Sequence, residues 1–290
     1  MKIRMVAKTD IGKERDKNQD AFTFCKDVSA HDWDHRGETE LGSEGALVVV
    51  VDGMGGTNAG EVASSLAIES LQNTFNTSNL SAVIASEEKI IAFLNDLVTT
   101  ADRHLNEHMV SHPETMGMGT TLVLCWILKD KAYIAWCGDS RCYVFNPHSG
   151  LKPLTKDHSY VQELIDKGEL TEEEALTHPD SNLITRGLGD LDSPAKADIT
   201  IHPIKSGDMF LLCSDGLCGY CTNKTIEDKV RSHYHDIDEC CEKLMELALH
   251  DGGFDNICVA LASVYNDADD QPHKSSLKQF FQNLFASKRV

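Results

Sequence analysis

The sequence lacks any apolar run long enough to cross a membrane or to act as a secretory signal. Its first residues read MKIRMVAKTD, and no stretch approaches the roughly 20 apolar residues of a membrane span. Ten cysteines are present, and without a secretory signal they are typical of reduced thiols. We therefore expect a cytoplasmic protein. The single Cys-x-x-Cys, at Cys218 and Cys221, has no second pair beside it that would complete a metal site.

Positive charge is also scarce. The chain has 27 Lys and Arg against 46 Asp and Glu, which gives a net charge of −19 at pH 7. Such a surface repels a polyanion, so nucleic acid is excluded as a partner of the whole chain. The segment 271–290 is the exception, because it has no acidic residue and contains Lys274, Lys278, Lys288 and Arg289.

One domain followed by a tail is the expected organisation. A chain of 290 residues with 41% hydrophobic and 25% charged residues can bury a substantial core. No internal repeat and no low-complexity linker precede Asn266. We therefore expect a single monomeric domain over residues 1–265 and a separate tail over residues 266–290.

The tail has the pattern of an amphipathic basic helix. Its large apolar residues recur at i, i+3, i+4, i+7 and i+8, at Leu277, Phe280, Phe281, Leu284 and Phe285. Exposed phenylalanines are costly in water, so this face needs a binding surface. Three surfaces remain open: the acidic body of the same chain, a partner protein, or an anionic membrane.

The segment LVVVVDGMGG, residues 47–56, organises the rest of the chain. Residues 47–51 form a continuous apolar run, which is typical of a strand buried on both faces. The run stops at Asp52 and a glycine-rich turn follows. A buried carboxylate needs a cation or hydrogen-bond donors. Asp52 is therefore either the cap of the helix that follows or an oxygen ligand for a hard metal ion.

The remaining chain alternates between strand and helix patterns. Residues 26–44 have no pattern and predict an exposed loop. Residues 131–137 and 141–145 predict a hairpin with its tip at Asp139. Residues 160–168 and 171–177 predict short polar helices that cover a site or bind a partner. Further strands are expected at 2–7, 21–25, 119–128, 208–213 and 257–264, and helices at 58–75, 87–109, 224–230 and 237–249.

Four aspartates fall at or beside the ends of predicted strands: Asp52, Asp139, Asp215 and Asp255. If these ends meet at one edge of a sheet, the carboxylates repel one another unless cations lie between them. Oxygen ligands without Cys or His favour Mg²⁺ or Mn²⁺. Several carboxylates around shared water suit a two-metal centre. Arg15 adds a guanidinium group that matches phosphate, so the set points to phosphoester hydrolysis.

These motifs occur in an order that resembles a known family. The segments RDKNQDAF, VVVVDGMGG, GTTLV, GDSRCYVF, LTKDHS, ITRGLG, LLCSDGL and DNICVAL resemble the metal-dependent PP2C-type protein serine/threonine phosphatases in their compact bacterial form. The resemblance covers about residues 4–264. It implies an α+β fold, a four-layer α-β-β-α sandwich of two antiparallel sheets flanked by helices.

The resemblance also implies roles for particular residues. Asp52 would bridge two Mn²⁺ or Mg²⁺ ions, and the carbonyl group of Gly53 would bind one of them. Asp215 and Asp255 would complete the protein ligands of the other ion. Catalytic roles are implied at Asp20, which would hold metal-bound waters, and at Arg15, which would bind the substrate phosphate. Asp139 would share a weaker third ion with Asp215, and residues 159–182 would form the variable flap.

One position departs from the family pattern. Eukaryotic members have a histidine after the Asp-Gly pair, which is proposed as the general acid, whereas this chain has Met54, as in many bacterial members. A metal-bound water would then have to protonate the leaving group. His158 lies in the DHS motif, and we expect a structural role for it.

The predicted function is hydrolysis of phosphoserine and phosphothreonine in proteins by a metal-activated water, which reverses a Ser/Thr kinase. The expected partners are phosphoproteins and a cognate kinase. No cysteine nucleophile is needed, since the Cys-x5-Arg pattern of cysteine phosphatases is absent. One alternative is a two-metal phosphoesterase for small molecules. The other is a degenerate phosphatase fold that only binds a partner, against which the intact set of aspartates argues.

Overall fold

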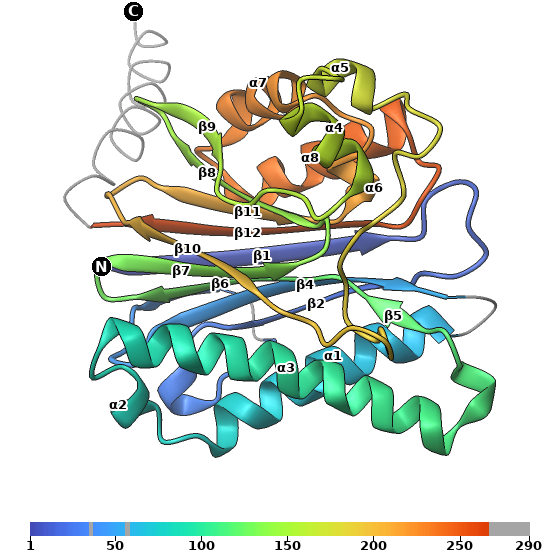
Figure 1. The fold of residues 1–290 in the computed structure, drawn as a ribbon. Helices are drawn as coiled ribbons and strands as arrows, with labels where there is room; N and C mark the ends of the chain where they lie inside the picture. The colour runs from blue at the N-terminus through green and yellow to red at the C-terminus, as the bar shows by residue number, and fades with distance from the viewer. Residues whose placement is uncertain (35–36, 56–58, 267–290) are drawn as a thin grey trace, which may run out of the picture.

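The computed structural model describes residues 1–34, 37–55 and 59–266. All of the predicted tail except Asn266 therefore lies outside the described residues. Two antiparallel sheets stack on each other, and helices cover the outer face of each (Figure 1). The predicted fold class, an α+β four-layer sandwich, is confirmed.

Strands from the two ends of the chain share the first sheet. In spatial order it contains β3 (Gly37–Glu40), β1 (Lys2–Asp10), β12 (Ile257–Tyr265), β11 (Met209–Cys213), β8 (Arg141–Asn146) and β9 (Gly150–Pro153). The second sheet contains β10 (Asp198–Pro203), β7 (Lys131–Cys137), β6 (Leu122–Leu128), β4 (Ala46–Met54) and β2 (Asp20–Cys25), and β5 (Gly119–Thr120) pairs with the end of β4.

Two helical layers enclose the sheets. The second sheet is covered by α1 (Ala59–Thr77), α2 (Leu80–Val83) and α3 (Glu87–Ser111), and the first by α6 (Asp215–Cys218), α7 (Asn223–His233) and α8 (Ile237–Asp251). The elements η1 (Val28–Ala30) and η2 (Pro113–Thr115) are short 3-10 helices. Helix α3 begins where Ser86 accepts a hydrogen bond from the Lys89 N–H group, 3.4 Å away. Among the described residues, no helix is both long and apolar enough to cross a membrane.

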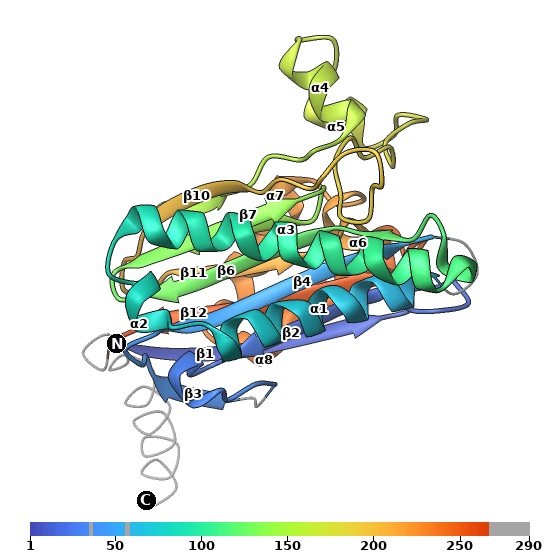
Figure 2. The ribbon, with the colours of Figure 1, turned by 60° about the horizontal axis from the view of Figure 1, so that its bottom comes forward.

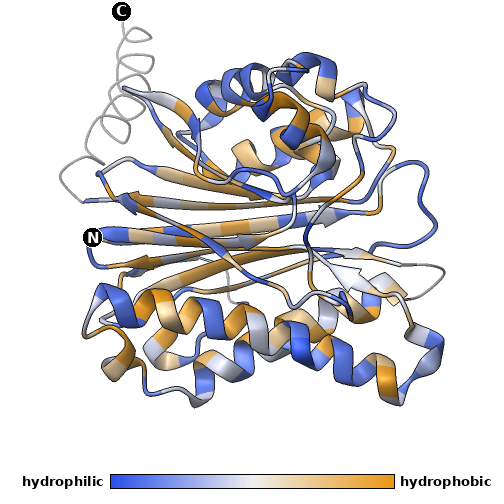
Figure 3. Ribbon diagram, viewed as in Figure 1, coloured by the Kyte–Doolittle hydropathy of each residue, from blue (hydrophilic) through white to orange (hydrophobic). Residues whose placement is uncertain are grey.

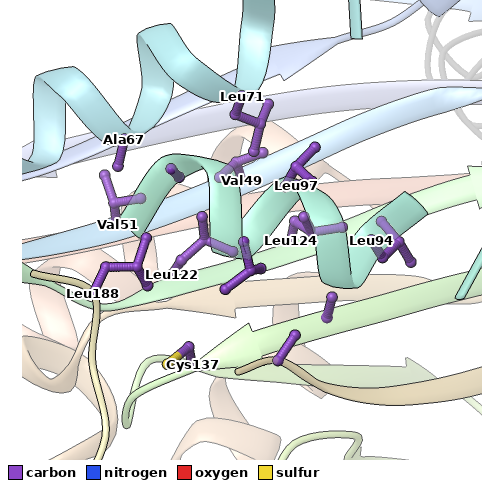
Figure 4. Packing of buried hydrophobic residues seen from close by; sticks show 14 of the residues in the cluster. Val49, Val51, Ala67, Leu71, Leu94, Leu97, Leu122, Leu124, Cys137 and Leu188 are labelled. Atoms are coloured by element: carbon purple, nitrogen blue, oxygen red, sulfur yellow. The ribbon is translucent and has the colours of Figure 1, made fainter. Parts of the chain in front are cut away.

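The apolar run at 47–51 is buried on both faces, as predicted. Val49 and Val51 of β4 pack with Leu71 of α1 and Leu97 of α3 in the core between the second sheet and its helices (Figure 4). Val48 points the other way, into the core between the two sheets. A third core lies between the first sheet and its helices. Figure 3 shows hydrophobic residues along the strands and on the inner sides of the helices, with hydrophilic residues outside.

Two sequence predictions about this framework are wrong. Strands β7 and β8 do not form a hairpin, because β7 pairs with β6 and β10 in the second sheet, whereas β8 pairs with β11 and β9 in the first. The chain crosses between the sheets at Asp139. Both strands are buried on both faces, so their sequences carry no alternation that would show which neighbour each one pairs with.

The second wrong prediction is the exposed loop at 26–44. Residues 37–40 form β3, which pairs with the outer edge of β1. Its sequence is GETE, and short polar edge strands have little strand propensity to reveal them.

The segment 154–197 leaves the sandwich and returns to it. It carries α4 (Tyr160–Asp166) and α5 (Glu172–Ala175), which project from the body in Figure 2. The capping box predicted at Thr171 and Glu174 is present: the Thr171 hydroxyl accepts from the Glu174 N–H group, and the Glu174 carboxylate accepts from the Thr171 N–H group. We call residues 159–182 the flap.

Candidate metal centre

The predicted carboxylates come from different strands and gather at one end of the sandwich. Asp20 opens β2 and pairs in register with Asp52 of β4. Asp215 opens α6 directly after β11, and Asp255 stands just before β12. Asp139 occupies the crossing from β7 to β8. The electrostatic repulsion that Asp52 receives from each of the other four shows that the structure brings all five together.

Hydrogen bonds of its backbone groups fix the position of Asp52. Its N–H group donates to Thr121 Oγ1 at 3.1 Å, and its carbonyl oxygen accepts from Thr121 N at 2.9 Å and Thr120 Oγ1 at 2.9 Å. Asp52 lies within β4, and α1 begins at Ala59, so it does not occupy the cap position of that helix. Its side chain is free to serve the site.

The glycine that follows Asp52 is required by close packing. A Cβ atom on Gly53 would lie 2.2 Å from the carbonyl oxygen of Gly60 and 2.8 Å from that of Gln19. The Gly53 N–H group donates to the Gln19 carbonyl at 3.2 Å. Gly53 therefore lets the end of β4 pack directly against the start of α1 and against the segment that leads to Asp20.

Asp20 is a buried carboxylate with one oxygen satisfied. Its Oδ2 atom accepts a 2.6 Å hydrogen bond from Ser214 Oγ, whereas Oδ1 is buried and accepts no hydrogen bond within the described part of the chain. Burial raises the pKa of Asp20 to about 8, and repulsion from Asp215 adds to the effect. The Asp52 side chain is within hydrogen-bonding reach of Asp20.

Asp215, like Asp20, has a carboxylate oxygen without a hydrogen-bond donor within the described chain. Its Oδ1 atom is buried and has no hydrogen-bond partner among the described residues. Burial, followed by repulsion from Asp255, raises the pKa of Asp215 to about 6. Asp52 is within hydrogen-bonding reach of Asp215 as well. Burial and repulsion from Asp20 raise the pKa of Asp52 well above its ordinary value. Asp52 is therefore within reach of two carboxylates that each have one buried oxygen without a donor in the described structure.

The Asp255 side chain connects the carboxylates to Arg15. One oxygen accepts from the Asn256 N–H group at 2.8 Å, and the other pairs with Arg15 Nη2 at 2.7 Å. The Arg15 side chain is 53% exposed, and its hydrogen bond with Asp255 raises its pKa. A charged guanidinium group thus lies at the mouth of the site, where it can reach an incoming anion.

Asp139 lies beside Asp215 on the flap side. It is 8% exposed, and burial followed by repulsion from Asp215 raises its pKa well above the ordinary value. Gly138 before it has φ +121°, and a Cβ atom there would lie 2.6 Å from the Cβ of Thr121. The crossing between the sheets therefore needs glycine at this point.

These residues fit divalent cations. Buried carboxylates with raised pKa values and oxygens without donors are costly, and a cation that replaces the missing donors removes the cost. Among the described residues, no group of three or more His, Cys, Asp or Glu side chains is already arranged as a closed metal cluster. The fit therefore rests on the unsatisfied oxygens of Asp20 and Asp215 and on their contact with Asp52. Oxygen ligands favour Mg²⁺ or Mn²⁺.

Met54 and His158 lie at different places in the site. A Cβ atom built on Gly187 would meet the Met54 Cε atom at 3.4 Å, so the methionine methyl group points toward the loop after the flap. His158 is 7% exposed. Its Nδ1 atom accepts from the Gly138 N–H group at 3.1 Å and its Nε2 atom lies 3.2 Å from Asp198 Oδ2. Burial lowers its pKa. Both ring nitrogens of His158 are engaged in holding the crossing and the base of the flap.

The sequence interpretation missed three residues that hold the site. Ser214 binds Asp20, Thr121 binds the Asp52 backbone, and Asn256 binds three backbone groups, of Ile11, Lys17 and Gln19. Each lies inside a segment that carries the family resemblance: Thr121 in GTTLV, Ser214 in LLCSDGL and Asn256 in DNICVAL. Membership of these segments was the available signal.

Comparison with known proteins places this geometry in a family. Residues 14–252 match the family model described as protein phosphatase 2C. The chain is 35% identical to the serine/threonine phosphatase stp of Listeria welshimeri over 234 residues, which covers 81% of this chain and 90% of that protein.

Two solved structures are also similar. The serine/threonine phosphatase Stp1 from Staphylococcus aureus has a TM-score of 0.77 at 32% identity, with 90% of this chain and 95% of that chain covered. The catalytic domain of the serine/threonine protein phosphatase PstP, in complex with 2 manganese ions, has a TM-score of 0.73 at 30% identity, with 91% and 99% covered. The chain belongs to the protein phosphatase 2C family. The family and the enzyme class predicted from the sequence are confirmed.

Proposed function

We propose that this phosphatase removes phosphate from serine and threonine residues of proteins, with Mn²⁺ or Mg²⁺ as cofactor, and so reverses the action of a Ser/Thr kinase. The observation that supports it best is the pair of buried, donor-free oxygens on Asp20 and Asp215, with Asp52 within hydrogen-bonding reach of both residues. The relatives named as serine/threonine phosphatases support the substrate class.

Each predicted ligand keeps a role in this proposal. Asp52 would bridge two ions, and its position within hydrogen-bonding reach of both Asp20 and Asp215 supports this role. Asp215 and Asp255 would hold one ion and the Gly53 carbonyl the other, while Asp20 would order water. The similar PstP domain contains 2 manganese ions, which supports two sites. A third ion between Asp139 and Asp215 is a separate proposal, supported by the repulsion between these two carboxylates.

The protein's own residues bind and orient the substrate. When bound, the divalent ions supply a nucleophile at neutral pH by lowering the pKa of water, and they neutralise phosphate charge. Arg15 would exchange part of its contact with Asp255 for a contact with the phosphate oxygens. Ser214 fixes the Asp20 carboxylate by donating to Oδ2. The methionine at position 54 offers no proton to the leaving alcohol.

The proposal is tested with a phosphothreonine peptide, Mn²⁺ or Mg²⁺, and a chelator. We expect hydrolysis that needs the metal, and a loss of several orders of magnitude in Asp52→Asn, because one bridging ligand serves both ions. Asp96→Asn is the matched control, since Asp96 is exposed on α3, away from the site. Full activity in chelator would refute the metal-dependent reaction.

Substrate choice separates the remaining alternatives. Efficient hydrolysis of small phosphate esters with none of phosphopeptides would favour a small-molecule phosphoesterase. No hydrolysis of either by a metal-loaded, folded protein would favour a binding module. The cognate kinase, the monomeric state, the cytoplasmic location, the domain boundary at residue 265 and the three candidate surfaces for the tail stay predictions.

A further inference from the structure

A groove opens between the flap and the helices after β11. Its volume is about 490 Å³, and it begins at Asp139 and Asp215 of the catalytic site. The flap helices α4 and α5 form one wall, and the segment from α6 to the start of α7 forms the other. The groove is therefore a continuation of the site on the side of Asp139, away from Arg15.

The flap wall of the groove is apolar at its base. Val161 and Ile165 of α4 and Ala175 and Leu176 at the end of α5 line it. Val161 and Ala175 are each 8% exposed, so other residues already cover them. Ile165 and Leu176 are half-buried and leave apolar surface for another chain to cover.

The cations that line the groove are already paired. Arg141 binds Asp157 through two hydrogen bonds, of 2.8 and 2.7 Å. Lys156 pairs with Asp166 at 2.6 Å, and Lys224 pairs with Asp228 at 2.6 Å. These pairs leave no uncompensated positive charge on the described residues that line the groove.

The two glutamates of α5 that line the groove, Glu172 and Glu173, are not compensated in this way. Glu172 accepts a 3.0 Å hydrogen bond from the neutral Asn223 side chain. Glu173 also lines the groove, and within the described chain it has no ion-pair partner. The charge that remains unpaired in the groove is therefore negative, and it lies beside the apolar residues.

We propose that this groove binds a lysine or arginine side chain of the substrate, close in sequence to the phosphorylated residue. The inference rests on the proposed function and names its substrate class: phosphoproteins with a basic residue beside the phosphosite. The aliphatic stem of Lys or Arg packs on Ile165 and Leu176, and the charged end reaches Glu173. Because the groove is continuous with Asp139 and Asp215, one peptide can occupy the groove and the catalytic site at the same time.

The test compares phosphothreonine peptides that differ at one position. A lysine is moved through successive positions on either side of the phosphothreonine, with glutamine and glutamate at the same positions as references. We expect kcat/KM for the best lysine peptide to exceed the glutamine peptide by up to about fivefold, the range of an exposed ion pair. Higher salt reduces this ratio, because the attraction is electrostatic.

Variants at Glu173 assign the preference to the groove. Glu173→Gln brings the lysine-to-glutamine ratio toward unity, and Glu173→Lys turns the preference toward the glutamate peptide. A purely structural role of Glu173 would change all peptides alike. Glu169→Gln is the matched control: Glu169 is exposed on the same flap outside the groove, and its ratios match the wild type.

Two failures are distinguishable in this experiment. Equal kcat/KM for lysine, glutamine and glutamate peptides, each hydrolysed with metal, overturns the basic-residue groove and leaves the phosphatase function standing. Hydrolysis of p-nitrophenyl phosphate without hydrolysis of any phosphopeptide overturns the proposed function itself. A preference for lysine that survives unchanged in Glu173→Lys also overturns the inference, because it places the recognition elsewhere.

Discussion

The Oγ atom of Ser214 donates a 2.6 Å hydrogen bond to Oδ2 of Asp20, a residue 194 positions earlier in the chain. Ser214 follows β11 in the first sheet, and Asp20 opens β2 in the second. The same Oγ atom accepts from the Cys258 N–H group of β12 at 2.9 Å. One hydroxyl group thus joins the two sheets at the site and fixes the orientation of a carboxylate.

Ser214→Ala is expected to weaken metal binding by about 10–100-fold while the protein remains folded, because Asp20 loses the donor that orients it. Calorimetric titration with Mn²⁺ and the metal dependence of kcat measure the effect. Ser232→Ala is the control, since the exposed Ser232 hydroxyl donates to the Asp228 carbonyl of its own helix. Metal affinity equal to the wild type in Ser214→Ala would show that the hydrogen bond does not tune the site.

The stability of the metal-free protein is expected to fall as pH rises. The ordinary pKa of Asp20 is 3.8 and its folded value is about 8. The folded state therefore holds a proton that the unfolded state has released, and stability is lost as pH rises from about 4 through about 8. In chelator, Tm should drop by several degrees across this window.

Two additions identify the cause of this pH dependence. Saturating Mn²⁺ should restore Tm at high pH, because the ions take the place of the protons. Asp20→Asn should flatten the pH dependence in chelator, whereas Asp96→Asn should not. A Tm that rises with pH in chelator would contradict the raised pKa values.

The sequence was sufficient to predict the strand that carries Asp52 and the main helices that cover the sheets. The buried run before Asp52 predicted a strand, and the structure has it as β4, which continues to Met54. Helical periodicity predicted α1, α3, α7 and α8, because each has one apolar face on a sheet. These predictions depend on local pattern, which a single sequence contains.

Contacts between distant segments could not be predicted in the same way. A Cβ atom on Gly216 would lie 2.0 Å from the Asn256 carbonyl oxygen, so this glycine is what lets Asp215 and Asp255 come together. The local sequence contains no signal that Asp215 and Asp255 lie close together. The false hairpin at Asp139 has the same origin, since strands buried on both faces fit either sheet.

Replacement of Asp139 distinguishes an ion ligand from a turn residue. If it holds a third ion, Asp139→Ala and Asp139→Asn should both keep the fold and the two-metal centre and lower turnover on phosphoprotein, by about tenfold. Asparagine suits turns as well as aspartate does. Wild-type turnover in Asp139→Asn across a metal titration would therefore favour a role in the turn alone.

The last prediction concerns the proton for the leaving group. With methionine at position 54, the wild-type pH–rate profile should have no limb from a histidine there. Met54→His should add a limb with an apparent pKa near about 6.5, and Met54→Gln, polar but not titratable, should not. Burial lowers the pKa of His158, and both of its ring nitrogens are engaged, so it cannot deliver a proton without giving up its contact with Asp198. A wild-type limb that disappears in His158→Gln, in a protein with unchanged Tm, would contradict this structural role and make His158 the acid.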